Sequence, residues 1–256
     1  MISRCAIPAF ALLSCFSTAA LAGDAAARNV IGFSPDGHHF AFEQYTMVYE
    51  DEASFSDYVI VDTRNDKFVR GTPIRILIRG DDGLDEKKAR ADALAKAKPL
   101  LERFQIGEPG TRIAGKPSMD LDDIGIYQIN QEPLAKSLVI PLPDGRKAQI
   151  GVSRHPIATV MCDGLGGRGT PGSAKGYGVK LTLKLADGPP IVLQHDKALP
   201  KSRRCAFDYG IAEAYLHKAP DGALTLAALL EYSDNDDYHA GPNRRFMAVT
   251  KRLPKP

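Results

Sequence analysis

The sequence predicts a β-rich α+β protein with antiparallel sheets, sandwich-like or partial propeller-like, and one principal helix. Segments with apolar residues at alternate positions recur along most of the chain, which is typical of half-buried strands. Three Pro-Asp-Gly turns, at residues 35–37, 143–145 and 220–222, lie between such segments. A helical spacing of apolar positions is found in one long segment, residues 84–104.

Four antiparallel strands are expected in the first third of the chain, at residues 29–33, 39–45, 58–62 and 74–79. A Ser-Pro-Asp-Gly turn joins the first two, because Pro presets the turn dihedral and Gly tolerates positive φ. In the fourth strand, three isoleucines alternate with Arg75, Leu77 and Arg79. Residues 50–57 are rich in acidic side chains and are expected to form a solvated connection.

The helix predicted at residues 84–104 is rich in alanine and lysine and is expected to be a solvated cover on a sheet. Either Asp81 or Asp82 is expected to cap its first turn. Pro99 lacks a backbone donor, so a kink or break is expected there. The apolar positions near helical spacing are Leu84, Ala91, Leu94, Ala95 and Leu101.

Residues 105–145 are rich in proline and glycine and form either a long surface excursion or the joint between two β-rich lobes. Short strands are expected within them at 125–130 and 136–140. The remainder is again strand-like, with strands at 179–185, 191–194, 209–217, 223–232 and 245–250. Segment 223–232 is apolar on both faces, which favours a central strand over a helix.

Residues 1–22 have the pattern of a secretory signal peptide: one positive charge, an apolar run and Ala20-Leu21-Ala22 at the cleavage site. A transmembrane anchor is less favoured because polar residues interrupt the run. A lipoprotein signal ending at Cys15 is the other alternative. We therefore expect a periplasmic or secreted protein in which residues 23–256 form a single β-rich module, with two lobes joined near 105–145 as the alternative.

Composition narrows the class of protein further. The chain has 33 basic and 31 acidic residues, a net charge of +2, which gives no reason to expect a nucleic-acid partner. Its 44% hydrophobic content is ordinary for a globular protein and excludes a disordered chain. No other stretch approaches membrane-spanning length, so no transmembrane segment is expected after signal cleavage.

Signal cleavage would leave Cys162 and Cys205 as the remaining cysteines. An exported chain meets an oxidising environment, so a disulfide between them is expected. The alternatives are a redox pair or two metal-binding thiolates. Neither cysteine belongs to a Cys-x-x-Cys arrangement, which favours the structural disulfide.

Two resemblances follow from these segments. Residues 33–42, Phe-Ser-Pro-Asp-Gly-x-x-Phe-Ala-Phe, with the strand at 58–63, resemble one strand pair of a β-propeller repeat of periplasmic translocation proteins. More of the chain, including the signal peptide, residues 32–37 and the ending at 241–249, is similar to a bacterial family of predicted secreted proteins of uncharacterised function. This second resemblance implies export and a module spanning the chain, and it brings no catalytic residue with it.

The glycine-rich stretch 164–178 contains a formal G-x-G-x-x-G match at residues 164–169. A dinucleotide site requires a helix after this motif, whereas a strand is expected here, so a flexible loop is favoured. Six histidines are present, and none has a recognised zinc spacing. His38 and His39 are adjacent on a hairpin, where they would point to opposite sides instead of to one ion.

Two charged clusters are the remaining candidates for binding. Asp234, Asp236, Asp237 and His239 offer oxygen-rich ligands of the kind that Ca²⁺ prefers, although an EF-hand pattern is absent and a solvated loop is favoured. Basic residues that could hold an anion include Arg203, Arg204, Arg244 and Arg245. Balancing of the acidic loops is the alternative explanation for these charges.

No nucleophile elbow or Ser-x-x-Lys motif is present, so no catalytic residue is assigned and no cofactor is expected. The leading hypothesis is a non-enzymatic periplasmic binding or interaction module whose partner is an envelope protein or a small ligand. The alternatives are a periplasmic hydrolase whose site forms only in the fold, and a calcium-binding envelope protein.

Overall fold

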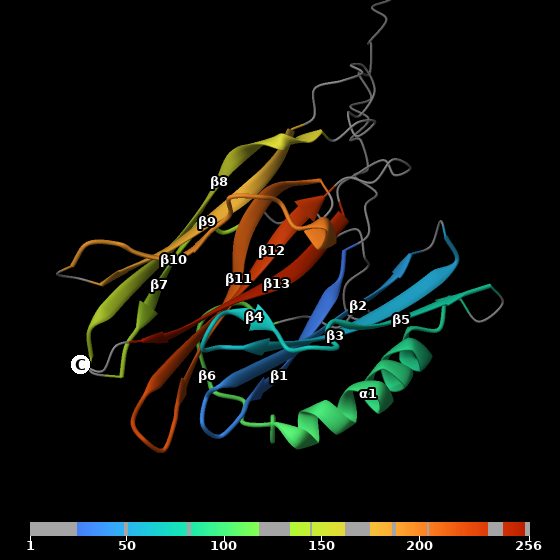
Figure 1. Ribbon diagram of the computed structural model, residues 1–256, viewed down its shortest axis with the longest axis horizontal. Helices are drawn as coiled ribbons and strands as arrows, with labels where there is room; N and C mark the ends of the chain where they lie inside the picture. The colour runs from blue at the N-terminus through green and yellow to red at the C-terminus, as the bar shows by residue number, and fades with distance from the viewer. Residues whose placement is uncertain are drawn as a thin grey trace, which may run out of the picture.

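The computed structural model describes residues 25–48, 51–80, 83–117, 134–143, 145–161, 175–185, 188–203, 205–234 and 243–253. Three antiparallel sheets and one long helix make up this part of the chain (Figure 1). The fold is therefore the β-rich α+β class that the sequence predicts.

The N-terminal sheet contains β1 (Ala27–Phe33), β2 (His39–Val48), β3 (Ala53–Asp62), β4 (Lys67–Phe68) and β5 (Ile74–Arg79). The central sheet has the order β13 (Asn243–Leu253), β12 (Leu224–Asp234), β11 (Ala206–Lys218) and β6 (Thr111–Gly115). The outer sheet has the order β10 (Ile191–His195), β9 (Lys175–Leu185), β8 (Lys147–Met161) and β7 (Ser137–Pro141). The helix is α1 (Glu86–Arg103), and η1 (Lys201–Arg203) is one short 3₁₀ turn.

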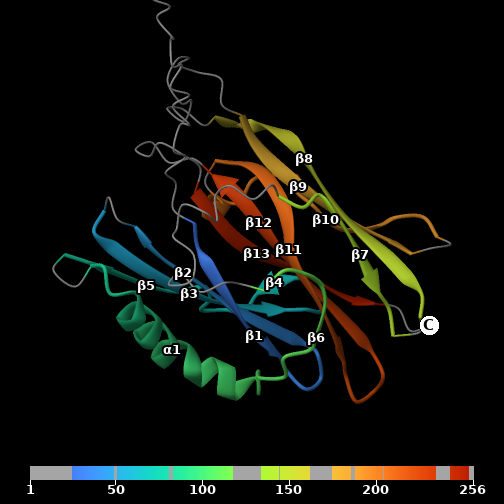
Figure 2. The same cartoon turned by 180° about the vertical axis from the view of Figure 1, so that it is seen from behind.

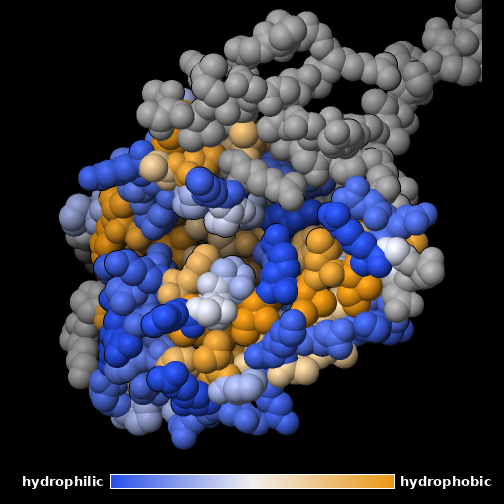
Figure 3. All heavy atoms as spheres, turned by 45° about the vertical axis from the view of Figure 1, so that its right-hand side comes forward, coloured by the Kyte–Doolittle hydropathy of each residue, from blue (hydrophilic) through white to orange (hydrophobic). Residues whose placement is uncertain are grey.

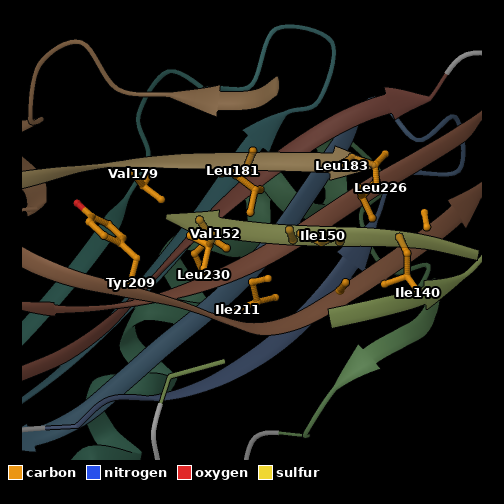
Figure 4. Packing of buried hydrophobic residues seen from close by; sticks show 14 of the residues in the cluster. Ile140, Ile150, Val152, Val179, Leu181, Leu183, Tyr209, Ile211, Leu226 and Leu230 are labelled. Carbon is orange, nitrogen blue, oxygen red and sulfur yellow. The ribbon is translucent and has the colours of Figure 1, made fainter. Parts of the chain in front are cut away.

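The central sheet is buried on both faces, which β12 illustrates. Leu226 and Leu230 belong to the apolar core shared with the outer sheet, where they lie near Ile150 and Leu181 (Figure 4). Leu229, from the alternate positions of the same strand, belongs to the core shared with the N-terminal sheet. The period of two thus sends successive side chains into two different cores, which confirms the central strand expected at 223–232.

Helix α1 covers the face of the N-terminal sheet that is turned away from the central sheet (Figure 2). Its buried apolar residues are Ala89, Ala93, Ala97 and Leu101. The predicted cover is confirmed and the predicted position Leu101 is buried, but three other predicted positions are wrong: Leu94 is 46% exposed, and Ala91 and Ala95 are also exposed. Small alanine side chains let the helix lie close to the sheet. The row of alanines is therefore buried, whereas the larger Leu94 faces solvent.

The ends and interior of α1 also correct two expectations. The cap is Asp85, whose carboxylate accepts a hydrogen bond from the Lys88 N–H at 2.8 Å, and Asp81 and Asp82 lie outside the described residues. Pro99 does not break the helix, which continues through it to Arg103. Packing of Ala97 and Leu101 against the sheet, on both sides of Pro99, offsets the lost backbone hydrogen bond.

A buried ion-pair network holds α1 on the sheet. Glu43 on β2 is 1% exposed and receives hydrogen bonds from Arg90 Nε at 3.0 Å and Arg90 Nη2 at 3.1 Å. Ser56 Oγ donates to the same carboxylate at 3.0 Å. Burial would lower the pKa of Arg90, but its hydrogen bonds and attraction to Glu43 raise it, so the guanidinium stays charged. The Arg90 guanidinium also lies 3.8 Å from the centre of the Tyr45 ring.

The expectation of a solvated connection at 50–57 is wrong for residues 53–57, which are the first half of β3. Asp57 is 1% exposed and lies opposite Arg75 of β5 in the register of the sheet. The acidic side chain tolerates burial because this cross-strand arginine neutralises it. The acidic composition of this segment therefore led to a wrong prediction, because the positive charge that compensates Asp57 lies on another strand.

The irregular segment joins two sheets, because β6 pairs with β11 in the central sheet and β7 pairs with β8 in the outer sheet. The strand expected at 136–140 is confirmed as β7, and the strand expected at 125–130 lies outside the described residues. Whether the chain folds as one unit or two lobes stays a prediction.

Two of the Pro-Asp-Gly turns meet at one end of the molecule. The Gly37 carbonyl accepts hydrogen bonds from Thr63 Oγ1 at 2.6 Å and from Thr225 Oγ1 at 3.2 Å. Gly37 has φ +69°, and a Cβ there would lie 2.8 Å from Thr225 Oγ1. Arg252 bridges the two turns through His38 and Asp221. The turns thus connect the N-terminal sheet to the central sheet.

Candidate functional site

A pocket of about 120 Å³ lies between the N-terminal sheet and the central sheet. It is lined by strands of the N-terminal and central sheets and by η1, through Gln44, Val48, Asp51, Ala53, Phe55, Arg75, Leu77, Arg79, Ser202, Tyr232, Asp234 and Arg245. Figure 3 brings forward the side of the molecule that carries β5 and α1, and shows hydrophobic and hydrophilic side chains interleaved across it. Both kinds of side chain line the pocket.

The alternation of β5 supplies one wall. Ile74 and Ile76 face α1 and pack against its core, so Arg75, Leu77 and Arg79 point to the opposite side of the sheet. Leu77 is 47% exposed. The half-buried strand predicted from the sequence is confirmed, and its polar side is a wall of the pocket.

Two arginines from different sheets meet at one aromatic ring. The guanidinium carbon of Arg245, on β13, lies 4.9 Å from the centre of the Phe55 ring, and that of Arg75 lies 5.5 Å from it. Phe55 is almost fully buried on β3, so the ring is a rigid support. Attraction between each cation and the ring holds two like charges near one another.

Arg75 is itself oriented by a buried carboxylate. Its Nε and Nη2 atoms donate to the two oxygens of Asp57 at 2.6 and 2.5 Å. The hydrogen bonds from Arg75 to Asp57 raise the pKa of the arginine. Gln44 Nε2 adds a longer contact to Asp57 at 3.4 Å, and Gln44 Oε1 accepts the Phe246 N–H at 2.8 Å. Both sheets therefore fix the position of this pair.

The back of the pocket is Tyr232 on β12. Burial, together with the nearby charge of Asp234, raises the pKa of Tyr232 to about 12. Its hydroxyl lies 3.5 Å from the Ser202 carbonyl, to which it donates. The phenol therefore stays neutral at physiological pH.

The candidate metal ligands can be placed only in part. Asp234 is buried at the end of β12 and lines the pocket, whereas Asp236, Asp237 and His239 lie outside the described residues. Within the part of the chain that the structure describes, no three His, Cys, Asp or Glu residues are grouped so that they could hold a metal ion.

The four candidate anion-binding arginines do not form one site. Arg203 is buried in a bidentate pair with Asp196, with Arg203 Nη2 donating at 3.0 Å. Arg244 is buried and pairs with Glu231 at 3.0 Å. Arg245 points to the other side of β13 and lines the pocket, and Arg204 lies outside the described residues.

The Asp196–Arg203 pair is buried, and its carboxylate accepts several hydrogen bonds from within the protein. Burial would raise the pKa of Asp196, but hydrogen bonds from Arg203 and from the Val179 N–H lower it below the ordinary value. Gln194 Nε2 donates to the same carboxylate at 2.5 Å. The carboxylate thus has partners on several sides, and Arg203 is held by it in the interior.

The adjacent histidines His38 and His39 lie where the turn meets β2. His38 Nδ1 lies 2.9 Å from Asp36 Oδ2, while the His39 ring stacks on Phe104 with ring centres 4.1 Å apart. The two adjacent rings therefore make separate contacts. Residues 164–169 and Cys162 lie outside the described residues, so the disulfide with Cys205 stays a prediction.

Sequence reasoning missed Phe55, Arg75 and Arg79 as site residues. The alternation of Arg75, Leu77 and Arg79 was the one available signal, because it places two cations and an exposed leucine on one face of a strand. Nothing in the sequence indicates that Arg245 joins them, since the contact forms between different sheets.

The sequence matches the family model described as "Predicted secreted protein (DUF2259)" over residues 41–252, and the chain belongs to this family. That description agrees with the periplasmic or secreted location expected from residues 1–22. No curated protein and no solved structure matches the chain. In the described ranges, no helix has both the length and the hydrophobicity to cross a bilayer.

Proposed function

We propose that this protein is a non-enzymatic binding module, whose pocket holds a carboxylate group attached to a short apolar body. The observation that carries the proposal is the meeting of Arg75 and Arg245 at the Phe55 ring. Two guanidinium groups supported on one buried ring offer fixed N–H donors to a carboxylate.

The donors needed for a ligand are available on Arg75. Its Nε and Nη2 atoms donate to the carboxylate of Asp57, and within the described residues no hydrogen bond is found for Nη1. Arg79, with a side chain 65% exposed, lies 3.9 Å from Asp51, a loose pairing that a bound carboxylate can compete with. Asp57 balances the charge of Arg75, and Arg245 adds a second guanidinium at the same ring, with its Nη1 donating to the Arg244 carbonyl at 2.9 Å.

The apolar lining defines the rest of the ligand. Val48, Ala53 and Leu77 contribute hydrocarbon surface beside the guanidinium groups. A few placed polar groups among apolar walls are typical of small-ligand sites. A short aliphatic chain carrying a carboxylate matches both parts of the lining.

The lining supports binding over hydrolysis. None of the residues that line the pocket is a histidine, cysteine or lysine. Tyr232 has a pKa of about 12, and the arginines stay charged, so neither residue type offers a base near neutral pH. The carboxylates of the lining are Asp51, which lies 3.9 Å from Arg79, and Asp234, and the lining offers no histidine or cysteine nucleophile beside them. The hydrolase and calcium-binding alternatives gain no support from the described residues.

The test is an NMR titration with glutarate, a dicarboxylate with a short aliphatic chain, that follows the arginine Nε–H signals. We expect saturable shifts for the intact protein and an affinity about tenfold lower for Arg245→Met. Arg70→Met is the matched control, because Arg70 is exposed, lies outside the pocket and carries the same charge. Equal affinity in the Arg245→Met and intact proteins would overturn the proposal.

A further inference from the structure

Strand β5 has an open and regular edge beside this pocket. It pairs with β3 over its six residues without a register shift. Among the described residues, no backbone hydrogen bond is found on its other side. An unpaired strand edge presents a row of N–H and C=O groups that can pair with another chain.

Other sheet edges are closed or irregular. Register shifts interrupt the pairings of β1, β6 and β10. Along β13, the Phe246 N–H donates to Gln44, and the Thr250 N–H donates to the Asp66 carboxylate at 2.7 Å. β7 ends at Pro141, which lacks a backbone donor. The β5 edge therefore lacks protections that these strands have.

The pocket continues toward this edge. Arg75, Leu77 and Arg79 occupy alternate positions of β5 and line the pocket together. In a strand added beside β5, every second side chain points to the same face. Those side chains would lie next to the two arginines and Leu77, where acidic groups meet positive charge.

The same charges disfavour a second copy of this chain. An antiparallel pair of β5 strands centred on Leu77 places Arg75 of each copy opposite Arg79 of the other. Like charges directly opposite one another destabilise a strand pair. An acidic strand in the same position instead faces the exposed guanidinium groups of Arg75 and Arg79. Arg75 is paired with buried Asp57, and Arg79 lies 3.9 Å from Asp51.

We infer that the β5 edge binds an extended acidic peptide by strand addition, with alternate carboxylate side chains entering the arginine pocket. This inference rests on the proposed function, since it names the ligand class of the same pocket. Backbone hydrogen bonds supply affinity, and the pocket selects acidic side chains.

The probe is a peptide of about eight residues with alternating glutamate and threonine and blocked termini, long enough to span β5. Calorimetry is expected to show binding at least about tenfold tighter than that of glutarate. N-methylation of one alternate set of peptide amides removes the donors that face β5 and is expected to abolish binding. N-methylation of the other set, which faces solvent, is expected to leave most of the affinity.

The outcomes separate the two proposals. If glutarate and peptide both bind but neither N-methylated set weakens the peptide, strand addition is wrong while the carboxylate pocket stands. If neither ligand binds, the pocket proposal fails as well.

A peptide with lysine in place of glutamate is expected not to bind, and equal binding would overturn the acidic preference. Dimerisation that Leu77→Lys abolishes, seen in analytical ultracentrifugation, would assign the edge to a second copy and overturn the inference.

Discussion

The core between the central and outer sheets differs in kind from the contact between α1 and the N-terminal sheet. The first is built from large aliphatic side chains, among them Ile150, Leu181 and Leu226, all fully buried. The second combines small alanines with the Glu43–Arg90 ion pair. The difference indicates that apolar area holds the sheets together, whereas directional polar contacts fix the position of the helix.

The largest effect is expected from a cavity in the aliphatic core. Leu181→Ala removes a side chain with 0% exposure and is expected to lower the free energy of unfolding by about 2–5 kcal/mol. Urea denaturation provides the measurement. Leu94→Ala on α1 is the matched control, because its side chain is 46% exposed and is expected to change stability by only about 0.5 kcal/mol. Equal losses in the two variants would contradict the comparison.

A loss in the lower half of that range is expected when the helix anchor is broken. Arg90→Met leaves Glu43 buried without its main partner, which is expected to cost about 3 kcal/mol in urea denaturation. The double variant Glu43→Leu/Arg90→Met removes both charges and is expected to recover most of that loss. A double variant that is less stable than Arg90→Met would show that the Glu43–Arg90 ion pair does not anchor the helix.

The smallest effect concerns the contact between Asp66 and β13. Burial raises the pKa of Asp66 above its ordinary value of 3.8, although hydrogen bonds from Thr250 oppose this shift. A raised carboxyl pKa in the folded state contributes stability below about pH 4 and loses it as pH rises through the folded pKa. Asp66→Asn keeps an acceptor for Thr250 and removes the titration, so the intact protein should lose stability relative to the variant between pH 3 and 7. Parallel stability curves for the two proteins over this range would exclude the effect.

Local patterns predicted much of the fold. Alternation identified β5 and β9, and the apolar run at 223–232 identified a strand buried on both faces. The same patterns failed where burial depends on a distant partner. From the sequence alone, Asp57 is predicted to be a surface residue, because its partner Arg75 lies on another strand. Likewise, the buried side of α1 is set by the sheet that the helix contacts.

The candidate site shows the same division. Arg245 and Asp234 were identified from clusters of charge, and both line the pocket. Arg203 and Arg244 came from equally basic segments, yet the structure pairs them with Asp196 and Glu231. A charge cluster in a sequence does not show which arginines are buried, because the carboxylates that pair with Arg203 and Arg244 belong to other parts of the fold.

By itself, the sequence determined that this is an exported, β-rich chain with one long helix, because export signals and hydrophobic periodicity are local properties. The tertiary structure decided which sheets stack, which side of α1 is buried and which arginines line the pocket. Periodicity specifies the face on which a side chain lies, but the partner on that face comes from residues far along the chain. The meeting of Arg75, Phe55 and Arg245 is such a contact, formed only when the N-terminal and central sheets pack together.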